Sequence, residues 1–254
     1  MENSEYDLVY ILKRGDYNPD LRYSLRSVAK YCTFRNIWLV GYCPSWVQNV
    51  FSIDLPQEGS KYSNSTDNLI AACQHPDISQ KFILMNDDFY ALKKIKDWET
   101  SCNKSRGSGI SLYQKLRKQM PMSNYRNEFL HTYTFLRKQN LPAREYELHI
   151  PMVIDKSEFL ELLQKPEIIQ FRAEHQIFMK RTIYKNYYMH EKPERQEHDV
   201  KLILQDFEGH YTEGEWLSLS DYMTDNFEKY PKLGEFFNKR FKSACKYEKD
   251  WRYW

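Results

Sequence analysis

The N-terminal third of the chain alternates between short apolar runs and amphipathic stretches. Residues 6–12 (YDLVYIL), 36–42 (NIWLVGY) and 81–87 (KFILMND) are mainly apolar, and turn or charged residues end each run. Runs of this length and composition are typical of buried strands.

Helical patterns separate these strands. Apolar residues recur at helical spacing in the stretch NPDLRYSLRSVAKYC, where Asn18 or Asp20 is placed to cap a helix. A second helix is predicted over 65–75, with Thr66 or Asp67 near its start. Strands that alternate with helices indicate parallel βαβ units, so we predict an α/β fold with a mixed, mostly parallel sheet flanked by helices.

The middle of the chain is basic. Residues 104–126 carry six Lys and Arg and no acidic residue, and we predict a mobile loop and a short basic helix there. A helix at 128–139, a strand at 146–155 and a helix that begins at Asp155 or Ser157 are expected to follow.

From about residue 171 the chain is rich in charged and aromatic residues, with helical spacing towards its end. We therefore predict a core over 1–170 and a helical C-terminal region, 171–254, that packs on the same core. The sequence contains no internal repeat and no low-complexity linker that would mark a sharper domain boundary.

Composition narrows the class of protein. Aromatic residues make up 16% of the chain, which argues against disorder because each aromatic side chain buries a large area. Five cysteines without a CxxC pair are read as reduced thiols in a cytosolic protein. No signal peptide and no run of roughly 20 apolar residues is visible, so a cytoplasmic protein is expected. The net charge of +2 indicates nothing about partners.

Two adjacent carboxylates follow the apolar run that ends at Met85. Ligands of open, largely parallel sheets bind beyond the carboxyl ends of the strands, where Asn86, Asp87 and Asp88 are expected to lie. Mg²⁺ commonly uses one or two carboxylates and completes its shell with phosphate oxygens and water. The alternative is that both aspartates only cap the next segment.

Basic residues follow the first strand. Lys13, Arg14, Arg22 and Arg26 are candidates to bind phosphate, since guanidinium groups form paired hydrogen bonds with phosphate oxygens. Tyr10, at the end of the same strand, is a further candidate for contact with a nucleotide. Alternatively, these arginines lie on a solvated helix face.

Several of these stretches resemble the Stealth family, whose members transfer sugar-1-phosphate from a nucleotide sugar. The similar pieces are the LRYSLRS stretch, the PSW turn and KFILMNDD in one region, and LHIPMVIDKSEFLELLQ with FRAEHQ in another. The similarity spans about residues 7–176. Met152 stands where the family has a second histidine, and Lys13-Arg14-Gly15-Asp16 replaces its usual Asp-Gly.

The resemblance implies a GT-A-like fold that binds a nucleotide sugar, with the C-terminal region on the acceptor side. It implies that Asp87 and Asp88 bind Mg²⁺ or Mn²⁺, that His149 acts as a general base, and that Arg172 holds phosphate. Alternates to His149 for the same work are Glu174 and His175, and Asp221 is an outside candidate for a metal ligand.

The resemblance thus implies a metal-dependent transferase that moves a sugar, or a sugar-1-phosphate, from a UDP-sugar to an acceptor hydroxyl on a glycan or a phosphorylated polymer. A second hypothesis makes the acceptor a hydroxylated base of phage-type DNA, bound through the basic segment 104–126. A third is a binding protein that keeps the fold without catalysis.

Overall fold

A computed structural model describes residues 5–119, 123–188, 190–196, 198–203, 205, 207, 211, 213–220 and 223–249. Its centre is a five-stranded sheet in the order β3-β2-β1-β4-β7, in which only β7 runs antiparallel to its neighbour. The strands are β1 (Asp7–Ile11), β2 (Ile37–Gly41), β3 (Phe51–Asp54), β4 (Lys81–Met85) and β7 (Met152–Asp155). The predicted α/β fold with a mostly parallel sheet is confirmed.

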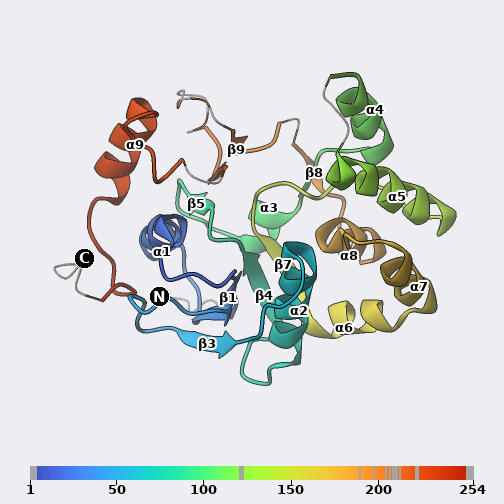
Figure 1. Ribbon diagram of the computed structural model, residues 1–254, viewed down its shortest axis with the longest axis horizontal. Coiled ribbons are helices and arrows are strands. Elements are labelled where there is room, and N and C mark those ends of the chain that lie inside the picture. Colours follow the sequence, from blue (N-terminus) through green and yellow to red (C-terminus); the bar gives the residue numbers. More distant parts are fainter. Residues whose placement is uncertain are drawn as a thin grey trace.

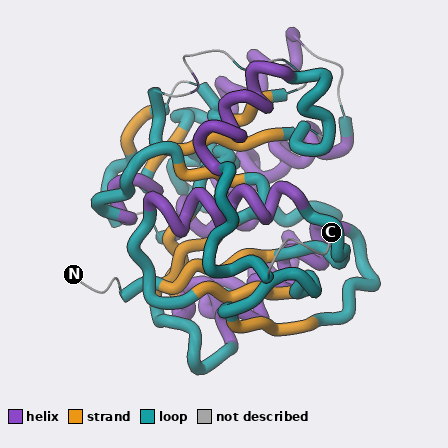
Figure 2. The backbone as a smooth tube through the Cα atoms, turned by 90° about the vertical axis from the view of Figure 1, so that its left-hand side faces the viewer, coloured by secondary structure: helices purple, strands orange, loops and turns teal. Residues whose placement is uncertain are grey.

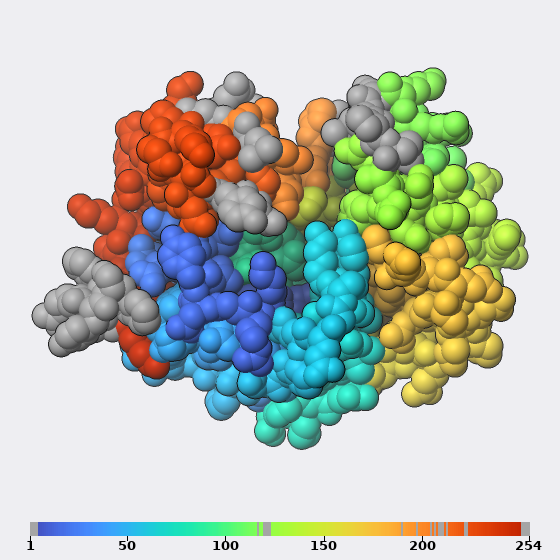
Figure 3. Space-filling view, viewed as in Figure 1, coloured from blue at the N-terminus to red at the C-terminus, as the bar shows by residue number. Residues whose placement is uncertain are grey.

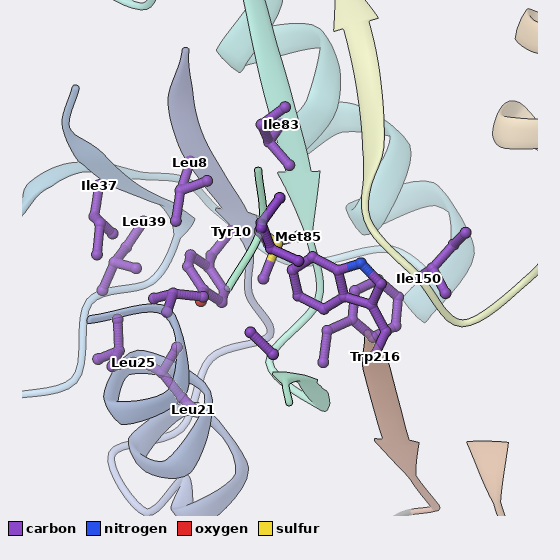
Figure 4. Close-up of a cluster of buried hydrophobic side chains, with 14 of the residues drawn as sticks. Leu8, Tyr10, Leu21, Leu25, Ile37, Leu39, Ile83, Met85, Ile150 and Trp216 are labelled. Atoms are coloured by element: carbon purple, nitrogen blue, oxygen red, sulfur yellow. The ribbon is translucent and has the colours of Figure 1, made fainter. Parts of the chain in front are cut away.

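Helices cover both faces of this sheet (Figure 1). The helix α1 (Pro19–Tyr31) lies on one face, whereas α2 (Lys61–Gln74) and α6 (Lys156–Gln164) lie on the other. Figure 2 shows from the side how helices alternate with layers of strands. Side chains alternate accordingly: Tyr10 points to the α1 face and Val9 to the α2 face. Figure 4 shows part of the α1-side core, which is filled by aliphatic and aromatic side chains.

Helix caps were partly predicted. Asn18 caps α1 by accepting a hydrogen bond from the Leu21 amide, and Asp155 caps α6, as expected. The cap predicted for α2 at Thr66 or Asp67 was wrong, because the helix begins at Lys61 behind Ser60. The first turn of α2 is polar and therefore carries no apolar periodicity.

The short basic helix predicted in the middle segment is present as α4 (Gly109–Gln119), and the short strand β6 (Lys104–Ser105) precedes it. The strand predicted at 146–155 is confined to β7. The remaining helices of this half are α3 (Trp98–Cys102), α5 (Asn124–Lys138) and α7 (Pro166–Glu174).

The C-terminal region is not purely helical. Its described residues contain α8 (Lys180–Tyr187) and α9 (Pro231–Phe241), and also the short strands β8 (Glu194–Arg195), β9 (Lys201–Leu202) and β10 (Trp216–Leu219). In a separate two-stranded sheet, β8 pairs with β6 (Lys104–Ser105). In a second sheet of three strands, β10 lies between β9 and β5 (Phe89–Ala91). This second sheet starts directly after Asp88 and therefore shapes the candidate site.

No helix among the described residues is long and apolar enough to cross a lipid bilayer. The five cysteines, all in the described part of the chain, form no disulfide.

A buried aspartate fixes the first strand. Asp7 accepts hydrogen bonds from Arg35 Nε at 2.9 Å, from Arg35 Nη2 at 2.5 Å and from the Ser79 amide at 2.9 Å. Burial favours a higher pKa for Asp7, but the hydrogen bonds from Arg35 and Ser79 outweigh it and lower the pKa. A carboxylate with a lowered folded-state pKa stabilises the fold above its unfolded pKa, and this stabilisation is lost as the pH falls.

We expect Asp7→Asn to lower the free energy of unfolding at pH 7 by about 2 kcal/mol, because hydrogen bonds to a charged group are lost. Urea denaturation of both proteins between pH 7 and pH 3 measures this. The difference should shrink towards pH 3, because Asp7 of the unfolded wild type takes up a proton there and the stabilisation begins to be lost. A difference that stays constant over this range would contradict the assignment.

Candidate functional site

A cavity of about 780 Å³ lies at the carboxyl ends of β1 and β4. Figure 3 shows it as a hollow between the loop after β1 (blue), α2 (cyan) and the C-terminal region (orange). Its lining is mainly polar or charged and includes Lys13, Arg14, Tyr17, Asn18, Asp20, Gln57, Lys61, Asn64, Ser65, Asn68, Asn86, Asp87, Asp88 and Asp225. The cavity therefore lies beyond the carboxyl ends of the strands, which is where open α/β sheets bind ligands.

The acidic pair lies at the floor of this cavity. Asn86, Asp87 and Asp88 form the turn between β4 and β5, and all three line the cavity. Oδ2 of Asp87 accepts a hydrogen bond from Asn18 Nδ2 at 2.8 Å. Because Asn18 also caps α1, the end of β4 and the start of α1 are held together.

The second sheet surrounds the other aspartate. Oδ2 of Asp88 accepts hydrogen bonds from Ser218 Oγ at 2.8 Å and from Lys201 Nζ at 3.2 Å. The register explains both contacts, since Ser218 of β10 lies opposite Phe89, and Lys201 of β9 lies opposite Ser218. Sequence analysis missed Lys201 and Ser218, and their short, weakly patterned strands gave no local signal.

Carboxylates crowd this part of the cavity. Asp20 accepts hydrogen bonds from Tyr90 and Thr224, and burial, together with the charges of Asp87 and Asp88, raises its pKa to about 7. Such crowding of negative charge suits a divalent cation with oxygen ligands.

In the described part of the chain, no group of three or more His, Cys, Asp or Glu is arranged to hold a metal on its own. The carboxylates of Asp87 and Asp88 each use Oδ2 to accept hydrogen bonds within the protein.

Positive charge lies on the β3 side of the cavity. Lys13 and Arg14 follow β1, and Lys61 begins α2. Arg14 is 3.4 Å from Asp54 of β3 in an exposed ion pair and lies over the ring of Tyr42. At the rim, Tyr17 is 79% exposed and donates a hydrogen bond to Asp225.

Three predicted contact residues lie elsewhere. Tyr10 is fully buried, with its hydroxyl group 3.0 Å from Ser24 Oγ in the core (Figure 4). Arg26 forms a two-pronged ion pair with Glu248, with both nitrogen–oxygen distances at 2.7 Å. Arg22 lies 3.7 Å from the same carboxylate and over the ring of Trp46. The two arginines thus anchor the C-terminal segment to α1.

His149 is not among the residues that line the cavity, but it is connected to them. Its Nδ1 lies 2.6 Å from Asp199 Oδ2, and its amide also donates to Asp199. The same aspartate accepts a hydrogen bond from the amide of Lys201, whose Nζ reaches Asp88. His149, Asp199, Lys201 and Asp88 therefore form a continuous chain of contacts. Asp199 was missed from the sequence because it lies 50 residues from His149.

The remaining candidates are away from the acidic pair. Arg172 lies on α7 over the ring of Phe178, outside the cavity lining. His175, at the end of the same helix, pairs with Glu128 at 3.2 Å. Glu174 accepts a hydrogen bond from Gln170. Asp221 lies outside the described residues.

Two of the six positive charges of the basic segment lie close to glutamates. Lys104 is within 4 Å of two glutamates, at 3.8 Å from Glu194 and 3.9 Å from Glu215. Arg106 lies 3.9 Å from the buried Glu145. The charge of Lys104 is therefore partly neutralised within the protein. Burial raises the pKa of Glu145 to about 8, so this residue compensates Arg106 less.

No protein-family model and no curated protein sequence matches the chain. Among solved structures, it is similar to galactosyltransferase LgtC in complex with donor and acceptor sugar analogs, with 10% identity over 97% of this chain and 99% of that chain and a TM-score of 0.52. Mouse xyloside xylosyltransferase 1 is more distant, with 13% identity over 96% of each chain and a TM-score of 0.38. Glycosyltransferase GlyE of Streptococcus pneumoniae has 8% identity over 75% of this chain and 44% of that chain and a TM-score of 0.38.

These comparisons bear on the two predictions that came from resemblance. Membership of the Stealth family is not confirmed, since no family model matches. The GT-A-like architecture is confirmed by the likeness to LgtC, which extends over nearly the whole of both chains. The chain therefore has the GT-A glycosyltransferase fold.

Proposed function

We propose that the chain is a metal-dependent glycosyltransferase that moves a sugar from a nucleoside diphosphate sugar, such as a UDP-sugar, to an acceptor hydroxyl on a glycan or another polymer. One observation carries the proposal: a polar cavity at the carboxyl ends of β1 and β4 has Asp87 and Asp88 at its floor, in a chain with the GT-A fold. A structural relative of that fold is described in complex with donor and acceptor sugar analogs.

The cavity residues divide into roles by charge. Asp87 and Asp88 would hold Mg²⁺ or Mn²⁺, which when bound neutralises charge on a leaving diphosphate. Lys13 and Arg14 are placed to contact phosphate oxygens, and the exposed ring of Tyr17 offers a face for stacking on the base. Asn86 orients the turn that carries both aspartates.

His149 is the proposed general base. Its imidazole removes the proton of the acceptor hydroxyl while that oxygen bonds to the anomeric carbon, and the bond from this carbon to the diphosphate oxygen breaks. Asp199 holds the ring in position and stabilises it once protonated, because burial favours a higher pKa for this carboxyl but the hydrogen bond from His149 keeps the pKa low. A single displacement of this kind inverts the anomeric configuration.

The nucleotide that is released tests the reaction. We expect incubation with Mn²⁺, a UDP-sugar panel and oligosaccharide acceptors to release UDP, as resolved by anion-exchange chromatography. Release of UMP would mean attack on the β-phosphorus and hence transfer of sugar-1-phosphate. Absence of turnover and of binding with every nucleotide sugar would refute the proposal.

A glycan acceptor is favoured over DNA. The charge of Lys104 is partly neutralised by Glu194 and Glu215, which leaves less positive charge at this end of the segment for a polyanion.

A further inference from the structure

Two adjacent cations approach the cavity from α8. Lys180 Nζ donates a hydrogen bond to Ser65 Oγ at 2.8 Å, and Arg181 Nη2 donates to Asn86 Oδ1 at 3.4 Å. Ser65 and Asn86 both line the cavity. Each cation therefore contacts a residue of the cavity wall.

Arg181 is held firmly in this position. Its Nη1 donates to the Ile150 carbonyl at 2.6 Å, its guanidinium carbon lies 5.2 Å from the ring centre of Phe89, and the residue is only 6% exposed. Burying a guanidinium group with so little exposure to solvent costs free energy unless an anion compensates its charge.

The protein supplies only part of that compensation. In the described part of the chain, neither Lys180 nor Arg181 has a carboxylate within 4 Å. The carboxylate of Glu147 interacts electrostatically with both cations, but it already accepts a hydrogen bond from the Thr182 amide. Asp88 interacts electrostatically with Arg181, but it is paired with Lys201. Burial lowers the pKa of Lys180 to about 8, and the negative charge of Glu147 offsets this effect only in part.

The sheet order places these cations relative to a donor. Lys13 and Arg14 lie towards β3, and the acidic pair follows β4. Arg181 contacts Ile150, which lies two residues before β7. With a diphosphate at the acidic pair, the amide-lined β3 side, which includes Gln57 and Asn64, suits the base and ribose. The transferred sugar then lies on the side of α8.

A neutral sugar in this position would shield both cations from water without providing an anion. We propose that Lys180 and Arg181 form a subsite for the carboxylate of the transferred sugar, so that the donor is a nucleotide-activated uronic acid. This inference rests on the proposed function, because it requires a nucleotide sugar in the cavity.

Calorimetry with matched donors tests the subsite. The probes are two pairs that differ by one carboxylate, UDP-glucose with UDP-glucuronate and GDP-mannose with GDP-mannuronate, together with UDP and GDP, all with Mn²⁺. We expect the uronate of one pair to bind at least tenfold more tightly than its neutral partner, as a charge-assisted hydrogen bond provides.

Lys180→Met and Arg181→Met should each abolish this preference while the affinity for the nucleoside diphosphate stays within threefold. Lys185→Met removes a positive charge from the same helix and serves as the matched control, which should keep the preference. Lys180→Met alone suffices if the buried Arg181 variant does not fold.

The outcomes separate the two proposals. If no nucleotide or nucleotide sugar binds, the proposed function fails and the subsite with it. If nucleotides bind but uronate and neutral donors bind equally, only the subsite is overturned. If Lys180→Met weakens the binding of UDP or GDP as much as the binding of the uronate donor, the cations bind the diphosphate. This result also overturns the subsite.

Discussion

Asp88→Asn is expected to lower kcat/KM for the nucleotide sugar by about a thousandfold, because a metal-binding charge next to the leaving diphosphate is lost. The asparagine oxygen can still accept hydrogen bonds from Ser218 and Lys201, so the second sheet should remain intact. Initial rates of nucleotide release, measured over a Mn²⁺ titration, provide the readout. The variant should also lose the Mn²⁺ dependence of donor binding in calorimetry.

Ser218→Ala is the matched control for this variant. It removes the hydrogen bond to Asp88 Oδ2 but leaves the carboxylate charge, so we expect a loss below tenfold and an unchanged response to Mn²⁺. If Asp88→Asn leaves turnover, donor affinity and metal dependence as they are in the wild type, the acidic pair is structural. In that case the cavity belongs to a binding protein or to an enzyme without this metal site.

His149→Gln is expected to reduce kcat by about 10²–10⁴-fold with little change in donor affinity, since it removes the proposed general base and no donor contact. A lower kcat with an unchanged donor affinity, measured by calorimetry, separates a catalytic role from a structural one.

Asp199→Asn should act through His149. It keeps the shape of the hydrogen-bonded pair but removes the negative charge, so we expect a smaller loss of kcat than in His149→Gln. His190→Gln is the control, because His190 forms a similar pair with Glu158 at 2.6 Å on an exposed surface. Equal losses in the His149 and His190 variants would remove His149 from the mechanism.

Much of the scaffold could be predicted from local pattern. Strands β1, β2 and β4 are short apolar runs between turn residues, and α1 has a capping residue in Asn18, one of the two candidates. The edge strand β3 was not predicted because its side chains are largely exposed and carry no burial pattern. Local patterns report burial, so they reveal the elements that are buried.

The positions of the candidate site residues could be predicted only in part. Asp87 and Asp88 were found because they directly follow a recognisable strand, and the sheet places them at the cavity floor. Arg22 and Arg26 have the spacing of a phosphate-binding helix face, yet both form ion pairs with Glu248. No local pattern distinguishes an arginine that binds a ligand from one that binds a distant carboxylate.

The sequence alone determined the alternating strands and helices and the acidic turn after β4, because these depend on residues close together in the chain. The tertiary structure decided what surrounds that turn. Lys201 and Ser218 reach Asp88 from 113 and 130 residues away, and α8 brings Lys180 and Arg181 to the cavity wall. Such contacts follow from strand register and helix packing, which many weak long-range interactions fix together.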